Sequence, residues 1–358
     1  MSETGRPRIA LIAASLDIVG GHGVQALALA EGLGRDGYAV ELIPVNPRFP
    51  LGLRWLRRCA YVRTVVNEAL FLPSLRALRQ ADVAHVFSAS YWSFLLGPVP
   101  AIEAARQMGK RVVLNYHSGE AADHLGRWGA LVHPWLRRAD EIVVPSEYLR
   151  EVFAPHGYRA RVIPNVVDTT RFGYRERGPM RPRLLSTRNL EPHYRVGHTL
   201  EAFRLIRARY PDATLTIAGY GSEEGRLRGL AAALGNDGIR FLGRVEPALM
   251  PDLYADHDIF VNASVVDNQP LSILEAFAAG LPVVSTGTGD IAAMVRAGER
   301  GRLVPAGDPG AMATAVVGLL EDPEGTRQMV RRARAAAEAH TWPHVRQAWA
   351  AAYAGRAA

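Results

Sequence analysis

The chain has 358 residues, enough for two domains that each bury a hydrophobic core, and its composition of 48% hydrophobic and 22% charged residues is typical of a globular protein. A single cysteine, Cys59, excludes an internal disulfide and any metal site built on several cysteines. The formal charge is +7, and Lys110 is the only lysine among the basic residues. This charge favours an anionic partner without choosing among phosphates, nucleic acid and anionic lipid.

The first residues do not have the pattern of a secretory signal peptide. An acidic residue, Glu3, precedes a short apolar run that leads directly into glycines. No stretch of 18 or more apolar residues occurs, so we expect no membrane-spanning helix. A cytoplasmic protein, placed at most at the inner face of a membrane, is the resulting expectation.

The first half of the chain alternates short apolar runs with helical patterns. Strands are predicted at 8–15, 39–45, 81–88, 110–117, 139–146 and 160–166, with a loop and helix over 20–37 and helices at 101–109 and 146–155. Alternation of this kind indicates an α/β fold with a parallel, doubly wound sheet that is covered on both faces.

The second half repeats this alternation. Strands are predicted at 183–189, 213–219, 239–245, 259–264, 282–286 and 301–306, and helices at 196–209, 222–234, 247–255, 270–279 and 309–320. Segment 169–183 is rich in Arg, Gly and Pro and is the predicted linker. We therefore predict two Rossmann-like domains, 1–172 and 173–342, that face a central cleft, with a helix over 343–358 that packs back on the first domain.

Ligands of open α/β sheets bind at the carboxyl ends of the strands, and glycines or polar residues follow several of the predicted strands. In the first domain these are Gly20 and Gly21, which precede a helix, and His117 after a central strand. The glycine loop fits an anion site or a tight turn, and His117 fits a ligand contact or a structural role. The next strand ends in Asn46 rather than an acid, which disfavours a nicotinamide-dependent dehydrogenase.

In the second domain, Arg188 and Arg195 follow the first strand, Gly219 and Gly221 follow the second, and Arg244 follows the third. The guanidinium fork suits a diphosphate because it donates two charge-assisted hydrogen bonds, although solvated surface arginines are the alternative. The glycines permit a close approach of backbone to a ligand.

The stretch "DNQPLSILEAFAAGLPVVST" (267–286) places Asp267 in a loop, Pro270 in the first turn of a helix, and Ser272 and Glu275 in its first turns. A helix N-terminus offers free N–H groups to an anion, and carboxylates accept hydrogen bonds from the vicinal hydroxyls of a ribose or a hexose. We predict phosphate at the helix N-terminus, ribose on one acid and sugar on the other. A capped helix with an incidental glutamate is the alternative.

Segments such as "NYHSG", "ADEIVVPSEYLREVF", "VIPNVVDTTRF", "TIAGYGSEEGRL" and "PLSILEAFAAGLPVVST" resemble, in order along most of the chain, the retaining glycosyltransferases of family 4, which have the GT-B fold. The two acids separated by seven residues, Asp267 and Glu275, match the family's most specific motif, with Asp where the family has Glu. The resemblance implies that Glu275 binds the donor ribose, Arg188 the diphosphate, and Asp267 the transferred sugar. It implies a donor site of Gly20, Gly21, Arg188, Arg195, Gly219, Gly221, Arg244, Asp267, Asn268, Gln269, Pro270, Leu271, Ser272 and Glu275, with Asp267, His117 and Arg188 as catalytic residues.

The same resemblance implies an enzyme that moves a sugar from a nucleoside-diphosphate sugar to an acceptor with retention of configuration, with no metal and no other cofactor. Asp267 and Val166 depart from the family's usual Glu and Gly. Two alternatives stay open: a nucleotide-sugar-binding protein without turnover, and a GT-B sugar-nucleotide epimerase. A lysine-dependent phosphorolytic enzyme is disfavoured, because Lys110 belongs to the first domain.

Segment 48–80 contains seven arginines and one acid, Glu68, together with apolar residues that include Trp55. Such a segment fits either a cationic surface that rests on an anionic bilayer or a core helix with a solvated arginine face. The first interpretation predicts a lipid-linked or polysaccharide acceptor from cell-envelope or exopolysaccharide synthesis. Nucleic acid is not an expected partner, because aromatic residues are not interleaved with basic ones on a strand or a groove-reading helix.

Overall fold

A computed structural model describes residues 5–15, 21–50, 52, 55, 59–235 and 237–356 of the chain. The chain divides into two compact units, the first formed by Met1–Pro164 with Val345–Ala358 and the second by Asn165–His344. Segment 165–172, which we predicted with the first domain, therefore groups with the second unit. Its backbone is bonded there, since the Val167 N–H donates to the His340 carbonyl at 2.9 Å.

The first unit is built on a six-stranded parallel sheet in the order β2-β1-β3-β4-β5-β6. Its strands are β1 (Ile9–Ala13), β2 (Val40–Pro44), β3 (Val83–Ser88), β4 (Arg111–Tyr116), β5 (Glu141–Val144) and β6 (Ala160–Val162). Its helices are α1 (Gly21–Arg35), α2 (Ala60–Ser74), η2 (Leu75–Gln80), α3 (Trp92–Leu96), α4 (Pro98–Gln107), α5 (Ala121–Arg127), α6 (Gly129–Leu136), α7 (Glu147–Phe153), η3 (Ala154–His156) and most of α15 (Trp342–Ala354).

The second unit has a sheet of the same kind, with the order β12-β11-β10-β7-β8-β9. Its strands are β7 (Arg183–Ser186), β8 (Thr214–Ala218), β9 (Ile239–Gly243), β10 (Ile259–Asn262), β11 (Val283–Thr286) and β12 (Arg302–Val304). Its helices are η4 (Pro192–Tyr194), α8 (Val196–Arg209), α9 (Glu224–Ala233), η5 (Pro247–Leu249), α10 (Met250–Ala255), α11 (Leu271–Ala279), α12 (Ile291–Val295), α13 (Pro309–Glu321) and α14 (Pro323–Glu338).

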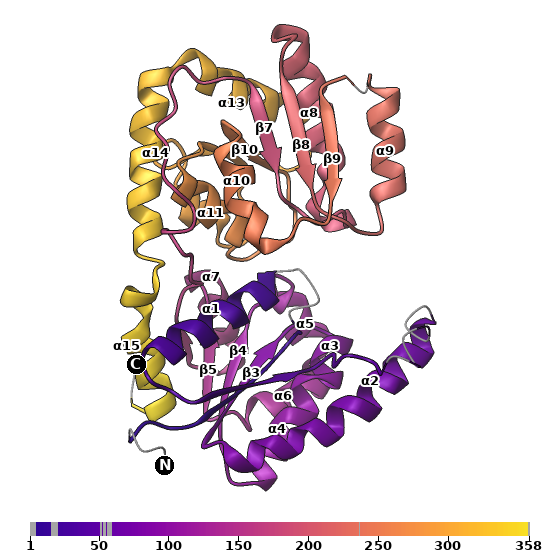
Figure 1. Cartoon of the computed structure of the whole chain (residues 1–358), viewed down its shortest axis with the longest axis vertical. Helices are drawn as coiled ribbons and strands as arrows, with labels where there is room; N and C mark the ends of the chain where they lie inside the picture. The colour runs from indigo at the N-terminus through magenta and orange to yellow at the C-terminus, as the bar shows by residue number, and fades with distance from the viewer. Residues whose placement is uncertain are drawn as a thin grey trace. The chain divides into compact units, whose positions relative to one another are not determined.

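Continuous apolar runs form these strands because both faces of each sheet are covered by helices (Figure 1). Strand β10 shows this directly. Ile259 and Val261 pack into one hydrophobic cluster, while Phe260, between them, packs into another. Neighbouring residues of a strand point to opposite faces, so two separate clusters mean two buried faces. The predicted α/β class with two doubly wound parallel sheets is confirmed.

The strand order places a switch point in each sheet. In the second unit, β7 continues through β8 and β9 on one side, whereas β10, β11 and β12 extend from its other side. The corresponding point of the first sheet lies between β1 and β3. Ligands of such sheets bind outside the carboxyl ends of the two strands at the switch point. A ligand site is therefore expected at the loops that follow β7 and β10.

The C-terminal helix α15 is held on the first unit by a buried polar contact. The Tyr353 hydroxyl lies 2.9 Å from Nδ1 of His85, and the Asn115 amide lies 3.1 Å from Nε2 of the same ring. Burial lowers the pKa of His85 to about 3, so its imidazole is neutral. Trp349 packs against the His85 ring at 5.0 Å between centroids, which adds aromatic contact to the hydrogen bond.

No helix in the described part of the chain is long and apolar enough to cross a membrane.

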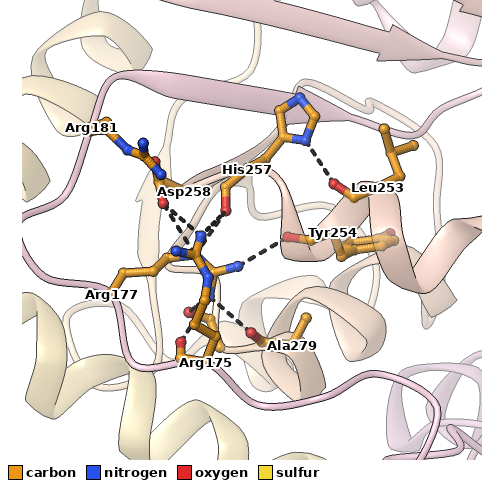
Figure 2. Close-up of polar contacts among 9 residues, drawn as sticks. Arg175, Arg177, Arg181, Leu253, Tyr254, His257, Asp258 and Ala279 are labelled. Atoms are coloured by element: carbon orange, nitrogen blue, oxygen red, sulfur yellow. Dashed lines mark hydrogen bonds and ion pairs between the residues drawn. The ribbon is translucent and has the colours of Figure 1, made fainter.

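One buried arginine from the segment before β7 organises the second unit (Figure 2). The Arg177 guanidinium donates to the carbonyls of Tyr254 (3.0 Å) within α10 and His257 (2.8 Å) after it, and to those of Ala279 (2.8 Å) and Gly280 (2.6 Å) at the end of α11. Carbonyls near a helix C-terminus lack their usual intrahelical partner and accept hydrogen bonds from outside the helix. The predicted linker thus contributes a cap that is shared by two helices.

The charge of Arg177 is balanced by Asp258, whose carboxylate lies 3.5 Å away and is also paired with Arg175 and Arg181. The Arg177 and Asp258 side chains are 2% and 1% exposed, whereas Arg181 is 55% exposed. Buried ion pairs are costly to break, and exposed ones contribute little.

Replacement of Arg177 by methionine is therefore expected to destabilise the second unit by about 3–5 kcal/mol, because it removes hydrogen bonds to five backbone carbonyls and the most deeply buried partner of the Asp258 carboxylate. Arg181→Met removes a partner of the same Asp258 from an exposed position and should cost less than about 1 kcal/mol. Urea unfolding followed by circular dichroism measures both. Equal effects of the two substitutions would contradict the role given to Arg177.

Candidate functional site

The loops after β7 and β10 bring together two residues predicted from separate segments, Arg188 and Asp267. The Arg188 guanidinium donates to the Asp267 carboxylate in a short ion pair and to the Ser272 hydroxyl at 3.1 Å. Its planar face lies on the Tyr194 ring, with 4.2 Å from the guanidinium carbon to the ring centroid. The paired side chains are only 10% and 12% exposed, so the charges attract each other in a partly desolvated site.

Helix α11 points its N-terminus at this pair. Pro270 is the N-cap residue with an extended backbone, and no side chain caps this end. The first turn therefore presents N–H groups and the positive end of the helix dipole. The helix is otherwise buried, and its residues Ile273, Leu274 and Phe277 pack into the core, which fixes its direction.

Glu275 lies one turn into α11 and is partly buried. The Tyr254 hydroxyl donates to its carboxylate at 2.9 Å. Burial raises the pKa of Glu275 to about 7, an increase that the Tyr254 hydrogen bond and the charges of Arg171 and Arg188 oppose. A carboxyl group with this pKa changes charge near neutral pH, which is unusual for a glutamate outside a functional site.

A polar network holds the loop that carries Asp267. The Asn262 amide donates to the Ser285 hydroxyl at 2.9 Å, and the Ser264 hydroxyl donates back to Asn262 at 2.6 Å. Gly289 packs against the same loop and has a φ of +56°. A Cβ added to Gly289 would lie 2.2 Å from the Asp267 carbonyl oxygen. Only glycine permits this approach, so the Asp267 backbone has little room to move.

The two glycines after β8 have a similar function on the Arg188 loop. A Cβ added to Gly219 would lie 2.1 Å from the Arg188 carbonyl oxygen, and one added to Gly221 would lie 2.4 Å from that of Leu190. We predicted that these glycines allow a close approach of backbone to a ligand. The structure shows that what they approach is the backbone of residues 188–190.

The other predicted residues of the second unit are less central. The Gln269 side chain accepts from the backbone N–H of Asn165 at 2.7 Å and its carbonyl accepts from the Asn165 amide at 2.8 Å, so it is engaged within the unit. Arg195 is exposed and has a left-handed backbone, with φ 48°, just before α8. Arg244 follows the edge strand β9 and pairs with Glu246 at 3.3 Å, two strands away from β7.

Asn268 and Leu271, the remaining predicted contacts, belong to the same loop and helix start. Asn268 is buried, and its backbone N–H donates to the Asp267 carboxylate at 3.0 Å. Leu271 is the first residue of α11. The roles of both residues toward a donor stay predictions.

In the first unit, His117 follows β4 and its ring stacks on Phe87 at 5.2 Å and meets His22 edge-on at 5.4 Å. Burial and the neighbouring histidines lower the pKa of His117 well below its usual value, so the ring is neutral. Gly21 is the first residue of α1, and Gly20 lies outside the described residues. The roles of His117 and of these glycines toward a donor stay predictions.

Three residues of the site were not predicted: Tyr254, Thr187 and Tyr194. The Tyr254 hydroxyl lies 2.9 Å from the Thr187 hydroxyl and 3.1 Å from the Ser272 carbonyl, in addition to its contact with Glu275. Its sequence signal, an aromatic residue on the apolar side of a short helix, is that of an ordinary core residue. Among the described residues, no three His, Cys, Asp or Glu side chains lie close enough together to hold a metal ion.

Gly219→Ala is expected to destabilise the protein by about 1–3 kcal/mol and to displace Arg188, since the new Cβ would overlap a backbone carbonyl that cannot rotate away. The matched control is Gly229→Ala in the exposed middle of α9, where a Cβ meets no atom within 4 Å. That change should stabilise by about 0.5–1 kcal/mol. Thermal unfolding measures the stability of both variants. An unchanged stability of Gly219→Ala would contradict the close approach.

Comparison with known proteins extends these observations. A family model described as "Glycosyltransferase Family 4" matches residues 19–171, and one described as "Glycosyl transferases group 1" matches residues 181–322. A glycogen synthase of Mycobacterium tuberculosis is 31% identical over 257 residues, which is 66% of this chain and 60% of that protein. The chain thus spans less than two thirds of the length of this relative.

Two relatives are covered more fully. The GDP-mannose-dependent alpha-(1-6)-phosphatidylinositol monomannoside mannosyltransferase of Mycolicibacterium smegmatis is 30% identical over 71% of this chain and 72% of its own length. The phosphatidyl-myo-inositol mannosyltransferase of the same organism is 27% identical over 92% of this chain and 88% of its own.

Solved structures agree on the fold. Sucrose-phosphate synthase from Thermosynechococcus elongatus superimposes with a TM-score of 0.77 at 19% identity, covering 97% of this chain and 100% of that one. HepE of Anabaena, in complex with UDP-glucose, gives 0.75 at 18% identity, covering 96% and 98%. The sequence matches and the two doubly wound sheets agree with each other, and the chain belongs to glycosyltransferase family 4, with the GT-B fold.

Proposed function

We propose that this protein transfers a sugar from a nucleoside-diphosphate sugar to an acceptor hydroxyl. The observation that carries the proposal is the convergence of Arg188, the uncapped N-terminus of α11 and the carboxylate of Glu275 at the switch point of the second sheet. The first two suit a diphosphate and the third suits the diol of a ribose. The names of relatives that use GDP-mannose, and of a structure that holds UDP-glucose, support this donor class.

In this proposal the donor replaces interactions that the protein now makes with itself. The Arg188 guanidinium, bonded to Asp267 and Ser272, turns its donors to the diphosphate oxygens. Because a diphosphate carries more charge than one carboxylate, it competes well for the guanidinium fork. Asp267 is then free to accept hydrogen bonds from hydroxyls of the sugar that is transferred.

We propose retention of configuration without a metal ion. The bond between the anomeric carbon and the phosphate oxygen breaks, and its electron pair stays on that oxygen. The acceptor hydroxyl attacks the anomeric carbon from the same face and gives its proton to the leaving phosphate oxygen. Arg188 and the N–H groups of α11 stabilise the negative charge that develops there. Asp267 stabilises the positive charge that develops on the sugar ring.

We propose an acceptor that is located at a membrane. Helix α2 buries Phe71 in the core of the first unit, yet it leaves Tyr61 90% exposed and Val65 69% exposed. Arg63 on the same helix and Arg76 just after it are exposed as well. Exposed apolar side chains beside arginines suit the surface of an anionic bilayer. Relatives named for phosphatidylinositol-based acceptors, and one named an exopolysaccharide phosphotransferase, support a lipid-linked or polysaccharide acceptor.

The donor site is tested by calorimetric titration with UDP, GDP, ADP and dTDP. Wild-type protein is expected to bind one of them at micromolar concentration, and Glu275→Ala should weaken that binding about 100-fold or more, because the partly buried carboxylate proposed to accept from both ribose hydroxyls is lost. Glu324→Ala, at an exposed position of α14, is the control that should leave binding unchanged. Absence of binding to all four nucleotides would contradict the proposed function.

Asp267→Asn separates catalysis from binding when nucleotide titration is combined with measurements of sugar transfer and donor hydrolysis. It removes a charge that competes for Arg188, so nucleotide binding should persist while sugar transfer and donor hydrolysis fall sharply. Equal losses in both would argue against a role for Asp267 on the transferred sugar. A wild-type protein that saturates with nucleotide sugar yet releases no sugar would instead be a binding protein.

Membrane contact is tested by co-sedimentation with vesicles of phosphatidylcholine, with and without phosphatidylglycerol. The wild type should bind only the anionic vesicles, and Tyr61→Asp/Val65→Asp should release it, since both the apolar contact and the charge attraction are weakened. Leu249→Asp alters a residue of the second unit that is 58% exposed and serves as the control. Unchanged sedimentation of the α2 variant would remove this part of the proposal.

A further inference from the structure

The hydroxyl of Tyr254 contacts three segments of the second unit at once. It lies 2.9 Å from the Thr187 hydroxyl, 3.1 Å from the Ser272 carbonyl and 2.9 Å from the Glu275 carboxylate. The side chain is fully buried. Thr187 immediately precedes Arg188, and Ser272 is the residue to which Arg188 donates, so the three contacts surround the proposed diphosphate and ribose contacts.

The number of protons available determines which of the three contacts of the Tyr254 hydroxyl are hydrogen bonds at one time. A phenol has one proton to donate, and the Ser272 carbonyl can only accept. When Glu275 is ionised, Tyr254 donates to its carboxylate and Thr187 donates to the phenol oxygen. When Glu275 is protonated, its own hydroxyl can donate to the phenol oxygen, and Tyr254 can turn its proton to Ser272. The same hydroxyl thus accommodates both charge states of the carboxyl group.

The position of Tyr254 is fixed at its backbone and its ring as well. Arg177 donates to its carbonyl at 3.0 Å (Figure 2). Its ring meets Phe172 edge-on at 5.4 Å and stacks on Phe260 at 5.9 Å between centroids. The hydroxyl therefore cannot follow Glu275 if the carboxylate moves, and it acts as a fixed point.

We infer that Tyr254 is a positioning residue for the donor: its hydroxyl orients the Glu275 carboxylate for the ribose and joins that contact to the Arg188 loop through Thr187. This inference rests on the proposed function, because it assigns a role to a residue of the same site. Tyr254 does not touch the donor in this proposal and acts through Glu275.

In the part of the chain that the structure describes, the charged and titratable groups that act on Glu275 are Tyr254 on α10, Arg188 in the loop after β7, and Arg171 in the segment before β7. Helix α14 also packs on α11, but its Arg334 donates to the Ala278 carbonyl, at the opposite end of α11. Burial and the Glu275 charge raise the pKa of Tyr254 well above its usual value, so the phenol keeps its proton at all pH values of the experiment.

The sign of the pH effect follows from these contacts. A ribose diol donates to the ionised carboxylate, so nucleotide affinity should fall as the pH drops through the pKa of Glu275, about 7. The Tyr254 hydrogen bond stabilises the ionised form, and its loss should raise this pKa.

The experiment measures the Kd of the nucleotide that binds wild-type protein, by calorimetry between about pH 5.5 and pH 9. In Tyr254→Phe the midpoint of the affinity loss is expected to move up by about one pH unit, which weakens binding about fivefold near pH 7 and about tenfold at the acidic end, while affinity at the alkaline end stays within a few fold of the wild type. A profile that overlays the wild type, or one that is lowered equally at every pH, would overturn the inference.

Two controls make the result specific. Glu275→Gln cannot titrate, so its profile records the titration of the nucleotide's own terminal phosphate, and adding Tyr254→Phe to it should cause no further pH shift. Tyr353→Phe removes another buried hydroxyl, bonded to His85 in the first unit, and should leave the profile unchanged. If wild-type protein binds no nucleotide, the proposed function fails. If it binds with a profile that Tyr254→Phe does not move, only the inference about Tyr254 fails.

Discussion

The ion pair between Arg188 and Asp267 is the interaction on which the geometry of the candidate site depends. It requires the loops after β7 and β10 to meet, and adjacent parallel strands supply that proximity. Gly219 lets the neighbouring loop pass against the Arg188 backbone, and Gly289 does the same for Asp267. A pair of charges that is only about a tenth exposed gains little stability from being there. In the proposed function, the pair holds the Arg188 guanidinium in position for the more highly charged diphosphate.

Glu275 is placed at a cost that the fold alone does not explain. Its pKa in the folded protein, about 7, lies above the ordinary value of 4.5, so the folded state holds the proton more tightly than the unfolded chain. The protein therefore loses stability as the pH rises from about 4.5 to 7, by an amount on the order of 3 kcal/mol. A glutamine would avoid that loss. In the proposed function, the Glu275 carboxylate is needed to accept hydrogen bonds from the ribose hydroxyls, a role that a glutamine would fill less well.

The sequence predicted much of this, for identifiable reasons. Continuous apolar runs predicted the strands. The positions of Arg188 and Asp267 at strand ends predicted the candidate site, because parallel strands have their carboxyl ends at the same edge of the sheet. Tyr254 could not be found in this way, since a buried tyrosine in a short helix looks like any core residue until its hydroxyl partners are known. The role of Gly219 could not be predicted either. The sequence indicates that a glycine allows a close approach, but only the fold shows that the approaching backbone is that of residues 188–190.

In the segment before β7, the composition of the sequence did not reveal a structural role. Arg, Gly and Pro without periodicity predict a linker, yet Arg177 in this segment is buried and caps α10 and α11 together (Figure 2). The same guanidinium fixes the carbonyl of Tyr254, whose hydroxyl meets Glu275. Two hydrogen bonds, joined through the Tyr254 side chain, thus connect the segment that precedes the second sheet to the carboxylate at its switch point. Because Arg177 and Tyr254 are buried, the geometry of the candidate site depends on packing remote from it as much as on the residues that line it.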